Sequence, residues 1–406
     1  MPNYADKAPG VYVEEVSSGG APIAGAGTST GGFIGILVDG RTMPTNPATN
    51  TSYTDVGAGE IVEITSYAEF TRAFGEADDF ELGMGVKGFF QNGGTRAFIY
   101  GLDPADLATP ADEDADADPY GDLGAALETA LSAFEDVDDI ALVAAPLPAE
   151  VLDRATVTPG TTEATIINEK LLTHCEACED RFAILAAPMT PPTVNADGIN
   201  QTRESEYGAI YFPFIDTTGK GDYHNPVGHI AGAYARVDGQ RGVHKAPANI
   251  VLSGAYGVST RLGRIKQGPL NAACINVIRM FGNSVTLWGA RTVAGSDSAF
   301  KYITTRRVYN YLRESIQDGL GWAVFEPNDA LLWARIRSTV NAFLTRVWQS
   351  GALIGDTAGE AFYVKCDAET TPSDVRDLGM VVTEIGVSIV RPAEFVIFRL
   401  SQKTAS

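Results

Sequence analysis

The chain has 406 residues, of which 45% are hydrophobic and 9% aromatic, so it is long enough for two domains and far from a disordered composition. Its net charge of −21 is uneven, because residues 1–200 hold 8 Lys and Arg against 33 Asp and Glu, whereas residues 201–406 hold 22 against 18. This acidity excludes nucleic acid as a partner of the N-terminal half, since phosphate binding needs cations. It fits either one solvated face beside a nearly neutral contact face, or adaptation to salt.

The N-terminal part of the chain suggests an arm followed by a compact region. Residues 1–20 are predicted to be the arm, with a short strand formed by Val11, Tyr12 and Val13. A glycine-bounded apolar run at residues 32–38 predicts a buried strand. Residues 65–92 show helical spacing of aromatic side chains, and residues 97–100 predict another strand.

Residues 103–122 are acidic, contain proline and are poor in large apolar side chains, which predicts a surface loop. Calcium binding is the alternative, but the spacing lacks the glycine and the terminal Glu of an EF-hand. Beyond the loop, predicted helices alternate with predicted strands, which is typical of an α/β domain. The helices are expected at 123–134 and 166–178, and the strands at 140–143, 182–185 and 207–214.

The pattern changes beyond about residue 260. Helices are predicted at 305–320 and 327–349, with a strand-like segment at 322–325 between them. The longer helix carries an apolar stripe made of Leu332, Ile336, Val340, Phe343 and Val347. Three further strands are predicted at 361–365, 381–390 and 394–400.

The sequence contains no nucleotide-binding loop and no Gly-x-Ser-x-Gly nucleophile motif. His174, Cys175 and Cys178 resemble half of a zinc or redox site, but the other cysteines are single and distant. Three residues of a Gly/Pro-rich loop offer a second possible metal site; they are Asp222, His224 and His229. Neither set has the order of a known motif, so we predict no catalytic, cofactor or metal site and no secretory signal or membrane span.

The end of the chain is apolar on both faces of a predicted strand, and the apolar residues are Phe395, Val396, Ile397, Phe398 and Leu400. Burying each one stabilises the protein by ~1.5–3 kcal/mol, and an exposed strand of this kind would aggregate. The strand therefore lies either at the centre of its own domain or beside another subunit. The strand in the N-terminal arm favours the second alternative, polymerisation by strand addition.

Several long motifs of this sequence resemble the contractile tail sheath family, in particular the compact sheath proteins of phage-tail-like injection systems. They are PGVYVEEV at 9–16, GVHKAPAN at 242–249, LNAACINVIR at 270–279, LWGART at 287–292, YLRESIQDGLGWAVFEPND at 311–329 and PAEFVIFRL at 392–400. Residues 40–170 match poorly, and members of the family often have LNPAGIN where this chain has LNAACIN.

The resemblance implies a structural subunit and not an enzyme. It implies hexameric rings stacked around an inner tube, docked on a baseplate and closed by a tail-terminator or cap protein. The terminal arms of two subunits would complete a β-sheet in a third, and contraction from a metastable extended state would drive the tube through a target envelope. The helix at 327–349 would face the tube, with Arg335, Arg337 and Arg346 as candidate contacts or, alternatively, as ordinary solvent-facing arginines.

The expected organisation is an N-terminal arm (1–26), an outer α/β domain (27–261) and an inner assembly domain (262–406). Assembly is expected in the cytoplasm, into a phage tail or tail-like particle, without insertion into a membrane. Two other classes remain: a different self-assembling shell or capsid protein, and an α/β hydrolase-like enzyme.

Overall fold

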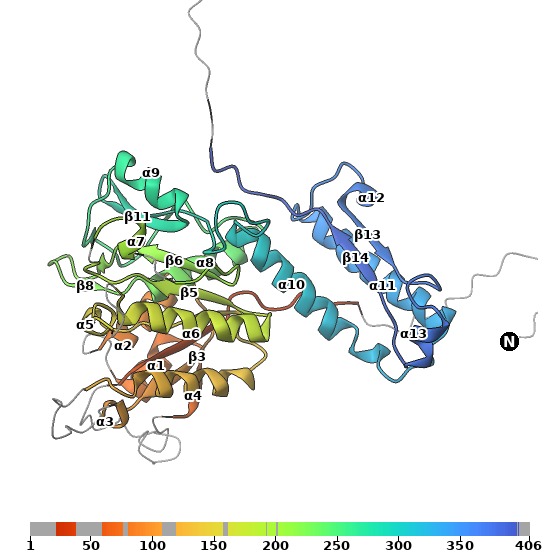
Figure 1. The fold of residues 1–406 in the computed structure, drawn as a ribbon, viewed down its shortest axis with the longest axis horizontal. Coiled ribbons are helices and arrows are strands. Elements are labelled where there is room, and N and C mark those ends of the chain that lie inside the picture. The colour runs from red at the N-terminus through yellow and green to blue at the C-terminus, as the bar shows by residue number, and fades with distance from the viewer. Residues whose placement is uncertain are drawn as a thin grey trace, which may run out of the picture.

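A computed structural model describes residues 22–37, 59–75, 80–107, 119–156, 161–191, 193–199, 202–395 and 397. These residues form a large domain built on a sheet and a small domain built on helix α11 (Ala330–Gln349), and helix α10 (Ile303–Gly319) joins the two (Figure 1). The mixed α/β class predicted from the sequence is confirmed.

A nine-stranded sheet runs through the large domain in the order β2-β3-β1-β4-β5-β6-β11-β12-β9. The strands from β3 to β11 are parallel, and β2, β12 and β9 add antiparallel pairs at the two ends. The parallel strands are mostly apolar because helices cover both of their faces. Their bounds are β1 (Gly31–Ile36), β2 (Ile61–Ile64), β3 (Ala97–Leu102), β4 (Leu142–Ala144), β5 (Phe182–Ala186), β6 (Gly208–Phe212), β9 (Ile250–Val251), β11 (Ile275–Phe281) and β12 (Ser284–Trp288).

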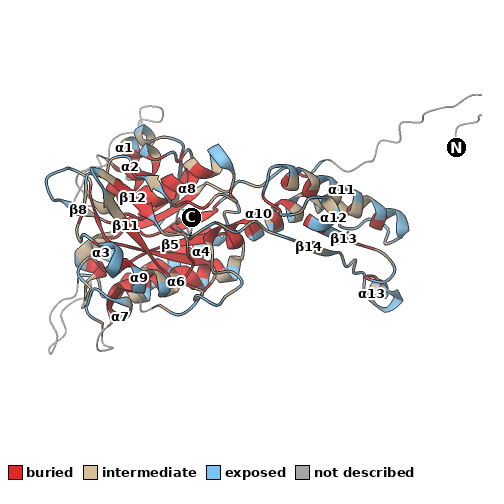
Figure 2. Cartoon of the chain, turned by 90° about the horizontal axis from the view of Figure 1, so that it is seen from above, coloured by how far each residue is buried: buried red, intermediate tan, exposed pale blue. Residues whose placement is uncertain are grey.

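Helices α1 (Tyr67–Phe74), α2 (Glu81–Gln91) and α8 (Val227–Arg241) cover one face of the sheet, and α4 (Leu123–Glu135) and α6 (Glu163–Cys178) cover the other (Figure 2). Glycines let α2 and α8 approach closely, because a Cβ atom at Gly228 would lie 2.1 Å from the carbonyl oxygen of Gly85. Shorter elements complete the domain: α3 (Pro104–Leu107), α5 (Ala149–Leu152), α7 (Ala196–Ile199), α9 (Arg264–Ala272) and a small sheet of β10 (Gly257–Val258), β7 (Ile215–Asp216) and β8 (Tyr223–His224).

The small domain is organised around α11. Asp329 caps this helix by accepting hydrogen bonds from the backbone N–H groups of Leu331 and Leu332, both at 2.9 Å. The predicted apolar stripe of α11 is buried, which confirms that expectation. The domain also contains η3 (Gly321–Ala323), α12 (Ala358–Ala361), α13 (Ser373–Asp377) and the antiparallel pair of β13 (Phe362–Lys365) and β14 (Glu384–Val387).

The buried apolar residues form two separate cores, one in each domain (Figure 2). Helix α10 contributes to both, since Ile303 lies in the large core and Val308 and Leu312 lie in the small one. The domain boundary expected at 261/262 falls inside the large domain, because β11 and β12 beyond it continue the nine-stranded sheet.

Several local predictions were wrong or only partly right. The strand expected at 322–325 is the 3-10 helix η3, and the long helix begins at Ala330, after the cap Asp329, and not at Pro327. The strand expected at 381–390 is limited to β14. Glu394 and Phe395 are not in a strand, whereas Val11, Tyr12, Val13, Val396, Phe398, Leu400 and residues 108–118 of the acidic loop lie outside the described residues.

Candidate functional site: the domain junction and the two arm roots

The N-terminal root, defined here as residues 22–30, runs along α10 between the two domains (Figure 1). Ile23 is buried in the small core, and Arg346 of α11 donates a hydrogen bond to its carbonyl oxygen at 2.5 Å. Further along, the backbone N–H of Ala26 donates to the hydroxyl of Ser315 on α10 at 2.9 Å. The first described residues are thus fastened to both helices before the chain enters the sheet.

A buried ion pair joins α10, α8 and the N-terminal root. Arg307 and Asp238 approach to 2.5 Å, and their side chains are only 4% and 3% exposed. Arg307 also donates to the carbonyl oxygen of Thr28 at 2.8 Å, and the Thr28 hydroxyl donates to Asp238 at 2.8 Å. The Arg307 guanidinium lies 4.9 Å from the ring centre of Tyr234. Because both charges are buried and paired with each other, this contact fixes how α10 leaves the large domain.

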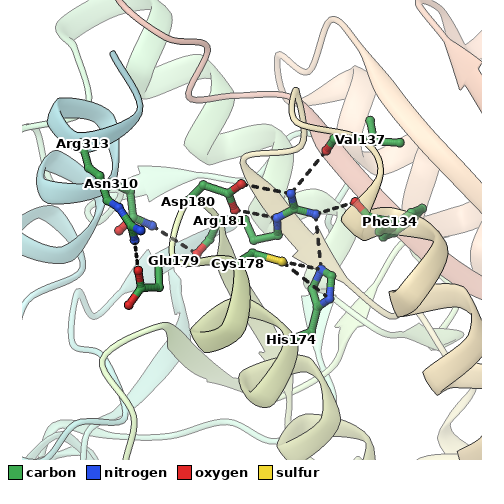
Figure 3. Close-up of polar contacts among 9 residues, drawn as sticks. All are labelled: Phe134, Val137, His174, Cys178, Glu179, Asp180, Arg181, Asn310 and Arg313. Carbon is green, nitrogen blue, oxygen red and sulfur yellow. Dashed lines mark hydrogen bonds and ion pairs between the residues drawn. The ribbon is translucent and has the colours of Figure 1, made fainter. Parts of the chain in front are cut away.

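A second polar cluster holds α10 against the end of α6 (Figure 3). At its centre the buried Arg181 donates to the carbonyl oxygens of Phe134 and Val137 at 2.8 and 3.3 Å and pairs with Asp180 at 2.7 Å. Asn310 of α10 donates to the backbone carbonyl of Arg181 at 3.1 Å.

One helical turn further along α10, Arg313 pairs with Glu179 on the surface (Figure 3). The described contacts of α10 with the large domain thus combine the apolar packing of Ile303 with polar, directional contacts, which suits a rigid connection between the domains.

The His174, Cys175 and Cys178 set is part of this packing. Burial and the charge of Arg181 lower the pKa of His174 to about 4. Burial raises the pKa values of both thiols, so the thiolate that a metal or a redox reaction requires is disfavoured. These environments favour neutral side chains that fill space.

The side chains of the second possible metal set, Asp222, His224 and His229, each contact a different partner. His224 approaches Glu81 at 2.8 Å, while His229 is buried and packs against Gly88 of α2. Asp222 accepts a hydrogen bond from Thr218 at 2.9 Å. Among the described residues, no three His, Cys, Asp or Glu side chains are gathered closely enough to hold a metal ion.

The C-terminal root, defined here as residues 388–394, returns from the small domain to the large one (Figure 1). The backbone N–H of Val390 donates to the carbonyl of Ala352 in the small domain at 3.1 Å. Glu394 pairs with Arg291 of the large domain at 2.9 Å. The side chains that follow are exposed: Phe395 is 69% exposed and Ile397 is 82% exposed. The sequence left two alternatives for the final strand, the centre of its own domain or a place beside another subunit. These two residues do not lie at the centre of their own domain.

The candidate arginines of α11 all make contacts within the chain. Arg335 lies 4.5 Å from the ring centre of Trp322, Arg337 donates to the carbonyl of Cys366 at 2.8 Å, and Arg346 bonds to Ile23 as described above. Their side chains thus already stabilise the small domain. Their role as tube contacts stays a prediction.

Two domains locked at a polar junction, with apolar side chains left exposed beyond it, are typical of a structural subunit that associates with others. Two family models match the chain: the phage tail sheath protein central domain over residues 124–293, and the phage tail sheath C-terminal domain over residues 295–403. The chain belongs to the phage tail sheath family. The division between the two models falls between β12 and α10.

Known relatives agree with this assignment. The chain is 29% identical over 173 residues to the tail sheath protein of Vibrio phage KVP40, a match that covers 42% of this chain but only 25% of that protein. It is similar to a chain of the anti-feeding prophage baseplate, with 30% identity, a TM-score of 0.74 and coverage of 98% of this chain and 99% of that one. It is also similar to the helical sheath of the anti-feeding prophage in its contracted state, with 29% identity, a TM-score of 0.74 and coverage of 97% and 99%.

None of the helices in the described part of the chain has the length and apolar character needed to cross a membrane.

Proposed function

We propose that this chain is the sheath subunit of a contractile, phage-tail-like particle. It polymerises as stacked hexameric rings around an inner tube and contracts from a metastable extended state to drive that tube through a target envelope. The observation that carries the proposal is its similarity, over 97% of its length, to a helical sheath in the contracted state. The similarity to a chain in a baseplate supports attachment to such a structure.

Subunits are joined by strand exchange through their ends. Phe395 and Ile397 lie exposed beyond the C-terminal root, so they are available to a neighbour. The pair β13–β14 packs on α11 and has two strands within the described residues, which suits it as an acceptor sheet. In this arrangement residues 11–13 of one subunit and residues 395–400 of another add strands to the β13–β14 sheet of a third.

Contraction is a rigid-body rearrangement of subunits, and the energy comes from better-packed interfaces in the contracted lattice. The buried pair of Arg307 and Asp238 supports this, because a subunit whose domains are locked can turn as one body. Arg335, Arg337 and Arg346 on α11 contact the tube in the extended state, beside their contacts within the chain. The particle is assembled in the cytoplasm from this chain, the tube, the baseplate and a terminator protein, and no enzymatic step, nucleic acid or cofactor takes part.

Electron microscopy of the full chain, expressed with its tube protein, tests the proposal. Wild-type material should form tubes with a sheath, and deletion of residues 395–406 should leave single, folded subunits, because Glu394 and everything before it are retained. Deletion of residues 401–406 alone is the matched control and should spare the tubes. Closed shells from the wild-type chain, or normal contractile sheaths from the longer deletion, would contradict the proposal.

A further inference from the structure

The carboxylate of Glu394 is held by donors from three separate parts of the large domain. Arg291 donates to both carboxylate oxygens at 2.9 Å, through its Nε and Nη2 atoms. Asn271 at the end of α9 donates to Oε1 at 2.7 Å, and the hydroxyl of Tyr302, just before α10, donates to Oε2 at 3.0 Å. Four hydrogen bonds fill the acceptor positions of a carboxylate, and a bidentate arginine fixes its orientation.

The residues that hold Glu394 are themselves tied to the centre of the sheet. The backbone N–H of Arg291 donates to the side chain of Asn276 at 2.8 Å, and Asn276 is fully buried on β11. Asn276 in turn donates to the carbonyl of Ile210 on β6 at 3.2 Å. A continuous set of hydrogen bonds therefore leads from Glu394 to two central strands.

Glu394 also stands at a sharp change in the chain. Val390 is still paired with the small domain, so only residues 391–393 span the distance between the two domains. Phe395, the very next residue, is 69% exposed. Burial disfavours the ionised carboxylate, but the hydrogen bonds from Arg291 and Asn271 outweigh this and lower the pKa of Glu394 below its usual value. The side chain is thus charged and fully engaged immediately before the exposed Phe395.

We propose that Glu394 is the anchor of the C-terminal arm: it transfers tension carried by the arm to the nine-stranded sheet, through Arg291 and Asn276. The inference rests on the proposed function, in which residues after 394 join a neighbouring subunit. Without the anchor, tension would act directly on the hydrogen bond between Val390 and Ala352 and then on the two-stranded β13–β14 pair. The small domain would therefore unfold from this end. With the anchor, the load falls on four hydrogen bonds that must break together.

The test combines two measurements on the full chain. The four hydrogen bonds that Arg291, Asn271 and Tyr302 donate to Glu394 are called the clamp below. Hydrogen exchange of peptides covering residues 388–395 in unassembled protein reports whether the clamp is closed. The mean length of tubes after a defined shear, measured by electron microscopy, reports whether the arm is anchored. The variant Glu394→Gln replaces one carboxylate oxygen with an amide NH2 group, a donor that faces other donors. The matched control is Asp377→Asn, an exposed carboxylate of the small domain.

Exchange of these peptides should rise about tenfold in Glu394→Gln, since a lost hydrogen bond to a charged group is worth at least that factor. Sheared tubes should be clearly shorter, and the control should match wild type in both measurements. If Glu394→Gln does not fold, Tyr302→Phe removes a single donor, and the same two changes are expected in smaller degree. Unchanged exchange, or faster exchange with tubes as long as those of the control, would overturn the anchor. If wild-type protein forms no tubes, the proposed function and the anchoring role fail together, while the exchange result still decides whether the clamp is closed.

Discussion

The junction between the domains depends on one buried charge pair, and this makes a quantitative prediction. Asp238 is 3% exposed and approaches Arg307, which is 4% exposed, at 2.5 Å. The change Asp238→Ala leaves a buried guanidinium without its counter-ion, and breaking a buried pair in this way costs ~3–5 kcal/mol. Thr28 would still accept one hydrogen bond from Arg307, so we expect the lower part of this range.

The assay is denaturant unfolding of the unpolymerised chain, with the midpoint and the slope fitted together. The matched control is Arg313→Ala on the same helix, because the side chains of the Arg313–Glu179 pair are 46% and 47% exposed. An exposed pair contributes only ~0–1 kcal/mol. Replacing both buried partners, Arg307→Met with Asp238→Leu, should cost less than Asp238→Ala alone, since no charge is left unpaired.

The reasoning would be refuted if Asp238→Ala lost no more stability than Arg313→Ala, or if the double variant were less stable than the single one. Either result would mean that α10 is held on the large domain by apolar packing and not by this pair.

Three further predictions concern α10 and α11. Burial and the charges of Asp180 and Asp318 raise the pKa of Glu314 from 4.5 to about 7. The folded state therefore favours the protonated acid. The stability that protonated Glu314 contributes is complete below about pH 4.5 and is lost as the pH rises through about 7. Glu314→Gln should flatten that part of the curve of unfolding free energy against pH. The side chain of Phe343 is 2% exposed in the small core, so Phe343→Ala should cost ~3–5 kcal/mol in denaturant unfolding, whereas Leu331→Ala, at 66% exposure, should be nearly neutral. Reversing the charge of Arg335 and Arg337 should reduce co-sedimentation with tubes while tube-free polymers still form; unchanged co-sedimentation would remove the tube-contact assignment.

Much of the fold could be predicted because local patterns determined it. Glycine-bounded apolar runs mark β1 and β3, and an apolar run without flanking glycines marks β5. All three strands are buried on both faces, as the centre of a parallel sheet requires. The stripe on α11 has helical spacing and is buried as expected. In contrast, the run at 322–325 is too short for periodicity to separate a strand from a turn of helix, and it forms η3.

The junction and the clamp could not be predicted, because their partners are far apart in the sequence. Arg307 and Asp238 are 69 positions apart, and Arg291 and Glu394 are 103 positions apart. A single sequence gives no sign of such pairs. Helix α8 was also missed, because its glycines weaken a helical pattern and serve instead for the close approach to α2. Asn271, Arg291 and Glu394 all lie in motifs that resemble sheath proteins, but only the structure shows that they meet.

In the proposed polymer, the two roots fix where linkages to other subunits begin. The described chain starts at the small domain, where Ile23 is buried, and its C-terminal root ends on the large domain at Glu394. Since α10 and its ion pairs hold these domains together, the separation of the two starting points is a constant of the monomer. In a polymer linked through both ends, each subunit then keeps a fixed distance between its two attachment points. Shortening of the whole assembly must come from a change in the angle between neighbouring subunits, and the number of subunits determines the total shortening.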